Sequence, residues 1–368
     1  MSGPIIIAAG GTGGHMFPAL ALARLLRTRG HEVKLMTDQR AAKMAQLVFA
    51  PGNVYVLPGA GIAGRGLLRG VAALGALARG VMAARKIFLQ SPPCAVIGFG
   101  GYPSVAPVFA ARFVKPRPLI VLHEQNAVFG RANRRLAGMA DVVALTFETT
   151  LKLPSGAKTV ITGNPVRDEI AAKSDVPYDA PVSGPIRLLI IGGSLGAKVF
   201  SKLVPPALAA LPEELRGRLV VTQQAREDSL NAVPNFYQTA GIEARVSSFF
   251  EDVAGLMANA HLVISRAGAS SVAEIAAIGR PAILIPLPDA IDDHQTENCR
   301  ALVKHQAAVW MPQPMLNSDL LATLLADFLA APERLAAMAK AAHDMARLNA
   351  THNLADLIEQ RLAARIAA

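Results

Sequence analysis

Cysteines, aromatic residues and long apolar runs are all scarce in this 368-residue sequence, and each shortage excludes a class of protein. The two cysteines, Cys94 and Cys299, lie in different halves, so neither a disulfide framework nor a zinc-binding spacing is present, and a reducing compartment is expected. Aromatic residues make up 5% of the chain and no nucleic-acid-binding motif occurs, which argues against a nucleic acid partner. No run reaches the roughly 20 apolar residues that a membrane-spanning helix requires.

Acidic residues are missing from a long interval of the first half. The 85 residues between Asp38 and Glu124 contain ten basic residues and no acidic one. Residues 1–163 have a net charge of +14, whereas residues 164–368 have a net charge of −4. Because a large excess of one charge favours partners of the opposite sign, the first half is expected to bind a phosphorylated substrate or an anionic membrane surface.

Two glycine-rich turns lie about half a chain length apart. Residues 4–7 are an apolar run that leads into the glycine-rich residues 8–15, and residues 188–191 lead in the same way into residues 192–197. Each pattern is typical of a buried strand, a glycine turn and a helix N-terminus, whose backbone N–H groups favour anions. With 52% hydrophobic residues available for two cores, the sequence predicts two Rossmann-like, doubly wound α/β domains that face a cleft.

Strand and helix patterns alternate along both halves, which is typical of parallel sheets. In the first half, strands are expected at residues 4–8, 32–37, 94–98, 119–123 and 142–146, and helices at 17–29, 71–89 and 130–137. In the second half, strands are expected at residues 188–191, 219–222, 246–248, 262–265 and 282–285. The expected domains are residues 1–163 and 164–345, followed by a C-terminal helix in 346–368 that packs back on the first domain.

The segment 66–90 is apolar and basic at the same time. One interpretation is an ordinary amphipathic core helix. The other is a peripheral membrane patch, in which Arg69, Arg79 and Arg85 contact anionic lipid headgroups. The sequence leaves both interpretations open.

The first glycine turn ends in His15, where a helix is expected to begin. A G-x-G-x-x-G reading from Gly11 places Met16 at the third glycine position, which argues against a nicotinamide dinucleotide, and no P-loop lysine follows. A histidine beside phosphate-binding N–H groups is a candidate general base, although a capping or merely solvated histidine would look the same.

Two further polar segments follow expected strands of the first half. Residues 98–104 form a second glycine turn that contains Tyr102, and His123, Glu124, Gln125 and Asn126 follow the apolar run at 119–122. Because ligands bind at the carboxyl ends of parallel strands, these four residues are expected to line a cleft rather than to form an ordinary polar loop.

In the second half, residues 265–274 follow a strand and open a helix, with small residues that let a diphosphate approach the backbone. Glu274 either interacts with the helix dipole or accepts sugar or ribose hydroxyls. Gln295 and Asn298 are spaced to share a helix face and suit sugar hydroxyls. The acids around His294 do not form a specific metal signature, so no obligatory metal or other cofactor is expected.

These motifs occur together in an order that resembles the peripheral membrane N-acetylglucosaminyltransferases of peptidoglycan synthesis, in glycosyltransferase family 28. The resemblance runs from about residue 5 to residue 298. It rests on the first glycine turn, the Gly-Gly-Tyr turn, His-Glu-Gln-Asn, Thr-Gly-Asn-Pro-Val-Arg, Gly-Gly-Ser-x-Gly-Ala, Arg-x-Gly-Ala and Asp-His-Gln-Thr-x-Asn. It implies two Rossmann-like domains in the GT-B arrangement.

The resemblance also implies an activity: transfer of GlcNAc from UDP-GlcNAc to lipid I, an undecaprenyl-diphosphoryl-MurNAc-pentapeptide, with inversion to a β-1,4 linkage. The protein would be peripheral at the cytoplasmic face of the inner membrane, with cell-wall synthesis proteins as possible partners. Helix N-termini and an arginine would stabilise the leaving UDP in place of a metal.

Site residues follow from the same resemblance, motif by motif. On the acceptor side these are Thr12, Gly13, Gly14, Tyr102 and Asn126, with His15 as the base and Glu124 as its competitor. On the donor side these are Arg167, Ser194, Phe250, Ala269, Ser270, Ser271, Glu274, Gln295 and Asn298. Leu195 departs from the family pattern, which often has Gln there, and is left out of the site.

Three alternatives remain at this stage. A related lipid glycosyltransferase, such as a diacylglycerol glycosyltransferase, would share most motifs but is disfavoured by His-Glu-Gln-Asn. A UDP-GlcNAc 2-epimerase would share the two-domain plan but would need no basic, lipid-facing patch. A non-catalytic nucleotide-sugar sensor or a nicotinamide-dependent enzyme is a third class.

Overall fold

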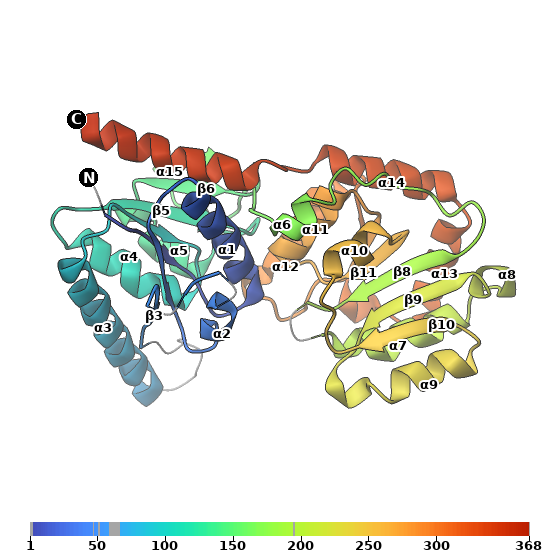
Figure 1. Ribbon diagram of the computed structural model, residues 1–368. Coiled ribbons are helices and arrows are strands. Elements are labelled where there is room, and N and C mark those ends of the chain that lie inside the picture. Colours follow the sequence, from blue (N-terminus) through green and yellow to red (C-terminus); the bar gives the residue numbers. More distant parts are fainter. Residues whose placement is uncertain (1–2, 47, 51, 59–66, 194–195, 368) are drawn as a thin grey trace. The chain divides into compact units, whose positions relative to one another are not determined.

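The computed structural model describes residues 3–46, 48–50, 52–58, 67–193 and 196–367, with only the backbone described for residues 67–72. The chain divides into two compact units (Figure 1). Unit 1 comprises Met1–Arg167 and Asn349–Ala368, and unit 2 comprises Asp168–Leu348. The expected domain boundaries, after residues 163 and 345, lie four and three residues before these divisions.

Unit 1 is built on a parallel seven-stranded sheet with the order β3-β2-β1-β4-β5-β6-β7. Its strands are β1 (Ile5–Ala8), β2 (Val33–Thr37), β3 (Val54–Val56), β4 (Ala95–Gly98), β5 (Leu119–Glu124), β6 (Val142–Leu145) and β7 (Thr159–Ile161). Its helices are α1 (Gly13–Thr28), α2 (Ala42–Ala45), α3 (Leu67–Gln90), α4 (Val105–Arg112), α5 (Arg131–Leu136) and α15 (Ala350–Ala367). Short 3₁₀ turns, η1 (Tyr102–Ser104) and η2 (Ala137–Met139), precede α4 and follow α5.

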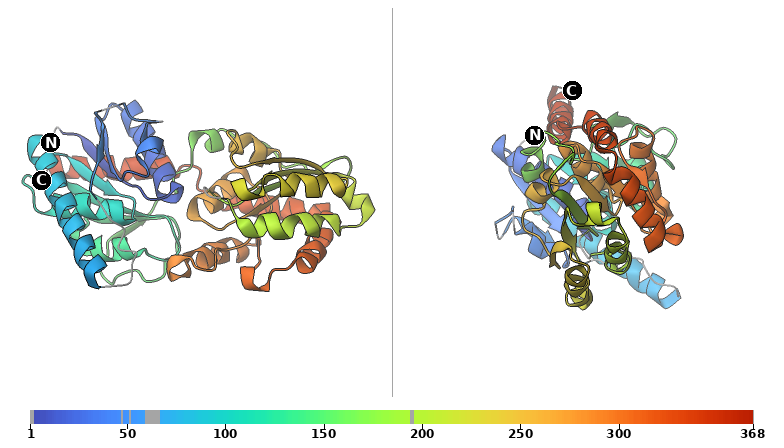
Figure 2. Two further views of the ribbon diagram at one scale, coloured as in Figure 1. Left: turned by 90° about the horizontal axis from the view of Figure 1, so that it is seen from below. Right: turned by 90° about the vertical axis from the view of Figure 1, so that its right-hand side faces the viewer.

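Both faces of this sheet are covered, which explains why its strands are continuous apolar runs rather than alternating ones. Ile5 and Ile7 pack into one core with α1, whereas Ile6 points to the opposite face and packs into a second core with α3 and α4. The helices α3 and α4 lie side by side on that second face (Figure 2).

The C-terminal helix α15 belongs to unit 1. It contacts α1, and its buried residues Leu354, Ile358 and Leu362 join the core that contains Ile5 and Ile7. Arg29, just after α1, donates to Asp356 and Glu359 on α15, at 2.6 Å each. The last residues of the chain therefore complete a core that the first residues begin.

Unit 2 repeats the plan with a parallel six-stranded sheet in the order β10-β9-β8-β11-β12-β13. Its strands are β8 (Ile186–Ile191), β9 (Leu219–Gln224), β10 (Glu243–Ser247), β11 (Leu262–Ser265), β12 (Ala282–Leu284) and β13 (Val309–Trp310). Its helices are α6 (Asp168–Ala171), α7 (Lys198–Ala209), α8 (Glu213–Arg216), α9 (Ala232–Thr239), α10 (Val253–Ala258), α11 (Ala269–Ile278), α12 (His294–Val303), α13 (Ser318–Leu329) and α14 (Pro332–Asp344). Two parallel α/β sheets confirm the predicted Rossmann-like class of each half.

A buried arginine joins residues 176–177, near the start of unit 2, to the C-terminal ends of α10 and α11. Arg280 is 1% exposed, and its guanidinium donates to five backbone carbonyls, those of Val176, Pro177, Ala258, Ile278 and Gly279, at 2.5–3.3 Å. The ring of Tyr178 lies 5.6 Å from the same guanidinium. Burial lowers the pKa of Arg280, because desolvation disfavours the charged form.

Candidate active site

The glycine turn after β1 carries the first cluster of predicted site residues. Gly11 has φ of +83°, and a side chain at Gly10 would place its Cβ 2.9 Å from Pro103 Cγ, so the turn requires glycines. Thr12 is the extended N-cap of α1, and no acidic residue lies in the first turn of this helix. The N-terminal N–H groups of α1 therefore keep their attraction for an anion.

Asp38, a residue that the sequence did not single out, ties three loops together at this edge of the sheet. Its carboxylate accepts from the backbone N–H groups of Ala41 at 3.0 Å and Gly11 at 3.4 Å, and from the hydroxyl of Tyr102. Burial, together with the hydrogen bond to Asp38, raises the pKa of Tyr102 to about 12. Tyr102 is therefore a neutral hydroxyl at physiological pH, held beside the first glycine turn.

His15 lies in the first turn of α1 and is half-buried. Its Nδ1 lies 2.9 Å from Oε1 of Gln125, at the end of β5. Gln125 in turn contacts His123, with 2.8 Å between its Nε2 and the histidine Nδ1, and His123 Nε2 lies 2.9 Å from the carbonyl oxygen of Gly163. Gln125 and His123 are buried, so His15 stands at the accessible end of a polar chain that runs into unit 1.

Glu124 is 2% exposed, and both oxygens of its carboxylate accept hydrogen bonds. Oε1 accepts from the backbone N–H and the side-chain amide of Asn126, at 3.1 and 3.2 Å. Oε2 accepts from the backbone N–H of Gly130 and the amide of Asn133, at 2.8 Å each. Four N–H donors thus hold this carboxylate and order residues 125–133 around it, which fixes the side chain of Asn126.

Arg167 is the last residue of unit 1. Its guanidinium lies 5.0 Å from the centroid of the Phe17 ring on α1, a cation–π distance. The predicted residues Thr12, Gly13, Gly14 and His15 share that helix, so the structure brings Arg167 to α1.

In unit 2, the second glycine turn follows β8. A side chain at Gly192 would place its Cβ 2.2 Å from the backbone nitrogen of Ala197, so only glycine fits there. The N–H of Gly192 donates to Gln224 at the end of β9, at 3.1 Å. The predicted residue Ser194, and Leu195 beside it, lie outside the described residues.

The second anion-binding candidate is the N-terminus of α11. Gly268 is its N-cap, and no acidic residue occupies its first turn. Ala269 and Glu274 are buried, whereas Ser270 and Ser271 are half-buried. Arg266, which precedes this turn, donates to the carbonyls of Ile285 and Pro286 at 3.0 Å, so this arginine braces the loop rather than projecting from it.

The two predicted sugar-binding amides lie on α12 and are held differently. Gln295 is half-exposed, and its Oε1 accepts from the N–H of Leu287 at 3.0 Å. Asn298 is fully buried, and its amide donates to the carbonyl of Ala267 at 3.0 Å. Asn298 thereby fixes the loop that leads into α11.

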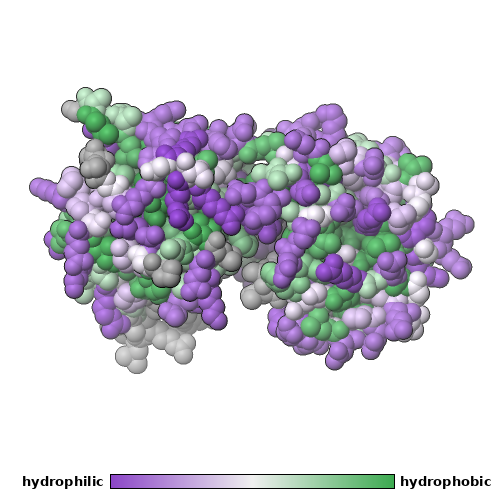
Figure 3. All heavy atoms as spheres, viewed as in Figure 1, coloured by the Kyte–Doolittle hydropathy of each residue, from purple (hydrophilic) through white to green (hydrophobic). Residues whose placement is uncertain are grey.

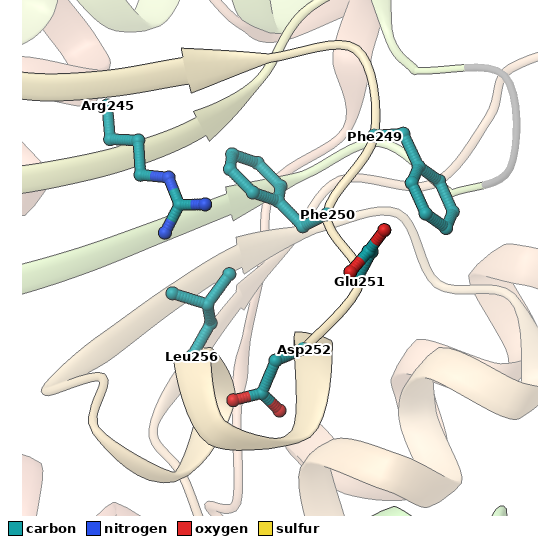
Figure 4. Close-up of a pocket in the computed structure, with 6 residues that line it drawn as sticks. All are labelled: Arg245, Phe249, Phe250, Glu251, Asp252 and Leu256. Atoms are coloured by element: carbon teal, nitrogen blue, oxygen red, sulfur yellow. The ribbon is translucent and has the colours of Figure 1, made fainter.

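A pocket of about 420 Å³ lies beside β10 and the N-terminus of α10 (Figure 4). Phe250 points toward Arg245 and Leu256, whereas Phe249 points the opposite way. The guanidinium of Arg245 lies 5.3 Å from the Phe250 ring centroid, and Phe250 is 5% exposed. The predicted residue Phe250 therefore lines a hollow with an aromatic and cationic wall.

No group of three or more His, Cys, Asp or Glu side chains in the described part of the chain is placed to hold a metal ion. Nor does any of the described helices combine the length and apolar character needed to cross a bilayer.

The chain matches two family models. The glycosyltransferase family 28 N-terminal domain covers residues 5–145, and the glycosyltransferase family 28 C-terminal domain covers residues 187–360. A UDP-N-acetylglucosamine–N-acetylmuramyl-(pentapeptide) pyrophosphoryl-undecaprenol N-acetylglucosamine transferase of Granulibacter bethesdensis is 51% identical over 98% of this chain and 94% of that relative.

Solved structures agree with this result. The crystal structure of Acinetobacter baumannii MurG has a TM-score of 0.79 and 31% identity, covering 97% of this chain and 99% of that one. The crystal structure of a UDP-GlcNAc 2-epimerase from Neisseria meningitidis has a TM-score of 0.64 at 11% identity, covering 97% of this chain and 100% of that one, which shows a shared fold alone. With both domain models matched and half of its residues identical to a full-length relative, the chain belongs to glycosyltransferase family 28.

Proposed function

We propose that this protein transfers GlcNAc from UDP-GlcNAc to the C4 hydroxyl of MurNAc in lipid I, which gives lipid II. The observation that carries this proposal is the identity of about half of all residues, over nearly the full length, with relatives that are named for this reaction. The acid-free, basic first half agrees with it, because the acceptor is a diphosphate anchored in a membrane.

The reaction is a single displacement with inversion. The acceptor C4 oxygen forms a bond to C1 of GlcNAc while the bond from C1 to the UDP oxygen breaks, and the electron pair leaves with UDP. The acceptor proton passes to a base. Negative charge grows on the leaving diphosphate, where the N–H groups of a helix N-terminus and the arginine Arg167 are suited to stabilise it.

We assign the base to His15 and a structural role to Glu124. His15 is half-buried at the helix start, where an acceptor can reach its ring. Glu124 is buried, and four N–H donors already occupy its two oxygens. Because both oxygens already accept hydrogen bonds from these donors, neither is placed to take a proton from the acceptor hydroxyl.

On the donor side, the α11 N-terminus with Ala269, Ser270 and Ser271 would bind the diphosphate, and Glu274 the ribose hydroxyls. Phe250 would lie at the uracil, since its pocket offers an aromatic wall beside the strand end (Figure 4). Gln295 would contact the GlcNAc hydroxyls directly. Asn298 would act indirectly, because its hydrogen bond to the Ala267 carbonyl positions the loop that leads into α11.

We also propose that α3 and α4 lie against an anionic membrane. The buried face of α3 includes Ala73, Ala76, Ala84 and Phe88, while Leu74, Met82 and Leu89 are 68, 62 and 54% exposed. Spacings of eight and seven residues place the three exposed side chains on one face. Hydrophilic and hydrophobic residues are intermixed at this edge of unit 1 (Figure 3).

The neighbouring helix α4 also exposes apolar side chains. Phe109 and Phe113, on and just after α4, are 37 and 59% exposed, and their ring centroids lie 5.1 Å apart. Arg79, Arg85 and Lys86 flank the exposed face of α3 in sequence; the side chain of Arg69 lies outside the described residues. Exposed apolar side chains among basic ones are the composition of a surface that inserts among anionic headgroups.

Charge reversal at Arg69, Arg79 and Arg85 is expected to weaken binding to phosphatidylglycerol vesicles on the order of 100-fold, since each basic residue near such a surface contributes about 1 kcal/mol. Sedimentation with vesicles measures the effect. The matched control reverses Lys173, Lys304 and Arg334 of unit 2, which should leave binding within about threefold of the parent protein. Equal loss in both triple variants would show that net charge, and not this surface, sets the affinity.

The activity is tested by incubating the protein with UDP-GlcNAc labelled in the sugar and a lipid I analogue in detergent. Label should enter the lipid fraction, with one UDP released for each sugar transferred. Consumption of UDP-GlcNAc without the acceptor would indicate an epimerase instead. No label in lipid, with acceptor and detergent present, would refute the proposed reaction.

A further inference from the structure

Two buried polar side chains behind His15 make no contact with the reacting groups of the displacement step. Gln125 is 1% exposed and His123 is 0% exposed. Buried polar groups are costly unless they are hydrogen-bonded, and a buried chain of them fixes the direction of each bond. In the hydrogen-bond chain from Gly163 through His123 and Gln125 to His15, the donor and the acceptor of each bond can therefore be assigned.

The Gly163 carbonyl, at the buried end of this hydrogen-bond chain, fixes which atom donates in each bond. The carbonyl oxygen of Gly163 can only accept, so Nε2 of His123 carries the proton of that 2.9 Å bond. Burial lowers the pKa of His123 to about 4, so its ring is neutral at physiological pH and its Nδ1 presents a lone pair. That lone pair faces the Gln125 amide.

The amide orientation of Gln125 is fixed twice. Its Nε2 lies 2.8 Å from the lone pair on His123 Nδ1, and it also donates to the backbone carbonyl of His123 at 3.1 Å. Turning the amide round would set its oxygen against two acceptors. Oε1 of Gln125 must therefore face His15, and it can only accept the 2.9 Å bond from Nδ1 of that ring.

We propose that Gln125 and His123 are positioning residues that hold neutral His15 with its proton on Nδ1, so that Nε2 is the atom that receives the acceptor proton. This inference rests on the proposed function, in which His15 is the base. With the opposite tautomer, the Nδ1 lone pair would face the lone pairs of Oε1, and Nε2 would already carry a proton.

The glycine turn after β4 leaves the Nε2 edge of this ring accessible. A side chain at Gly101 would place its Cβ 3.3 Å from Cδ2 and 3.5 Å from Nε2 of His15, and one at Gly100 would lie 3.5 Å from Cε1. Both glycines have positive φ, +79° and +69° for Gly100 and Gly101, so side chains are disfavoured there by the backbone as well. The same turn thus carries Tyr102 and keeps the base uncovered.

The tautomer is tested first in the unmodified full-length protein, by ¹H–¹⁵N NMR of the imidazole nitrogens above neutral pH. We expect His15 to show a protonated Nδ1 and an unprotonated Nε2, and His123 to show the reverse. His15→Ala and His123→Phe assign the two sets of signals. A proton on Nε2 of His15 in the unmodified protein would overturn the proposal, whatever the variants do.

Two variants of Gln125 then test the consequence for turnover. Gln125→Met keeps the length of the side chain but removes donor and acceptor, so kcat should fall about 100-fold while KM for both substrates changes less than about threefold. Gln125→Glu restores an acceptor for Nδ1–H of His15, but its second oxygen replaces the amide that donates to His123, so the His123 proton must move to Nδ1. This variant should therefore recover kcat only in part, to within about tenfold of the parent, with the original His15 signals and altered His123 signals.

The two proposals fail in different ways. An active His15→Ala variant would remove the base assignment on which this inference rests. An inactive His15→Ala variant, together with a fully active Gln125→Met variant and unchanged imidazole signals, would leave the base in place and refute the positioning chain. Equal losses in Gln125→Met and Gln125→Glu, with the original His15 signals kept in the glutamate variant, would also refute it.

Discussion

Replacement of His15 by alanine is expected to lower kcat by about 10²- to 10⁴-fold, the usual contribution of a positioned general base. The dissociation constant for UDP-GlcNAc should change less than about threefold, because the donor-binding candidates lie mainly in unit 2. The measurement is steady-state turnover with labelled UDP-GlcNAc and a lipid I analogue, together with calorimetric binding of UDP-GlcNAc.

Two further variants make this result specific. His31 follows the other end of α1 and contacts Glu359 at 2.8 Å, so His31→Ala removes a histidine of the same unit without touching the candidate site. Glu124→Gln replaces one acceptor oxygen with an amide group whose N–H groups face N–H donors. Because those donors then lose their acceptor, the variant should have a lower melting temperature. Turnover per folded molecule should change little. Near-normal turnover of His15→Ala, with strong loss in Glu124→Gln, would transfer the base role to Glu124.

The second large effect concerns stability. Arg280→Leu is expected to lower the free energy of unfolding of unit 2 by about 3–5 kcal/mol, because it removes the donor from three buried carbonyls, of Ala258, Ile278 and Gly279, and from two partly buried ones. Arg280→Lys should recover part of this loss, since one ammonium cannot reach all five oxygens in the planar pattern of a guanidinium. Trp310, the single tryptophan of the chain, lies on β13 of unit 2, so its fluorescence in a urea titration reports the unfolding of this unit.

The control is Arg226→Leu in the same unit. Arg226 has an exposed side chain and lies 3.8 Å from Asp228, a surface ion pair of the kind that contributes about 0–1 kcal/mol. If Arg280→Leu lowers the free energy of unfolding no more than Arg226→Leu does, the hydrogen bonds of Arg280 to the five carbonyls make no net contribution to the stability of unit 2.

The sequence predicted the central strands of both sheets because those strands are buried on both faces and therefore read as continuous apolar runs. It missed β3, β7 and β13, which have two or three residues each and lie at or beside sheet edges. Such short strands form because a neighbouring strand offers backbone partners, and composition carries little sign of this. One strand was predicted only in part: the sequence predicted residues 246–248, whereas β10 spans Glu243–Ser247.

The candidate site was predictable at its strand ends and helix starts, where His15, Glu124 and Asn126 follow recognisable patterns. The contacts that assign roles to these residues were not predictable. His15 and Gln125 are 110 positions apart in the sequence, and Asp38 meets Tyr102 across 64. Their pairing depends on the strand order β2-β1-β4-β5, which places four loops at one edge, and no single segment encodes that order.

The placement of α15 in unit 1 has a consequence for the order of synthesis. Leu354, Ile358 and Leu362 complete the same core as Ile5 and Ile7, although all of unit 2 is translated between them. On the ribosome, residues 1–167 emerge before unit 2 but keep an apolar face exposed until α15 leaves the exit tunnel. The second unit can close its own core earlier, so the unit that is made first is the last to be finished.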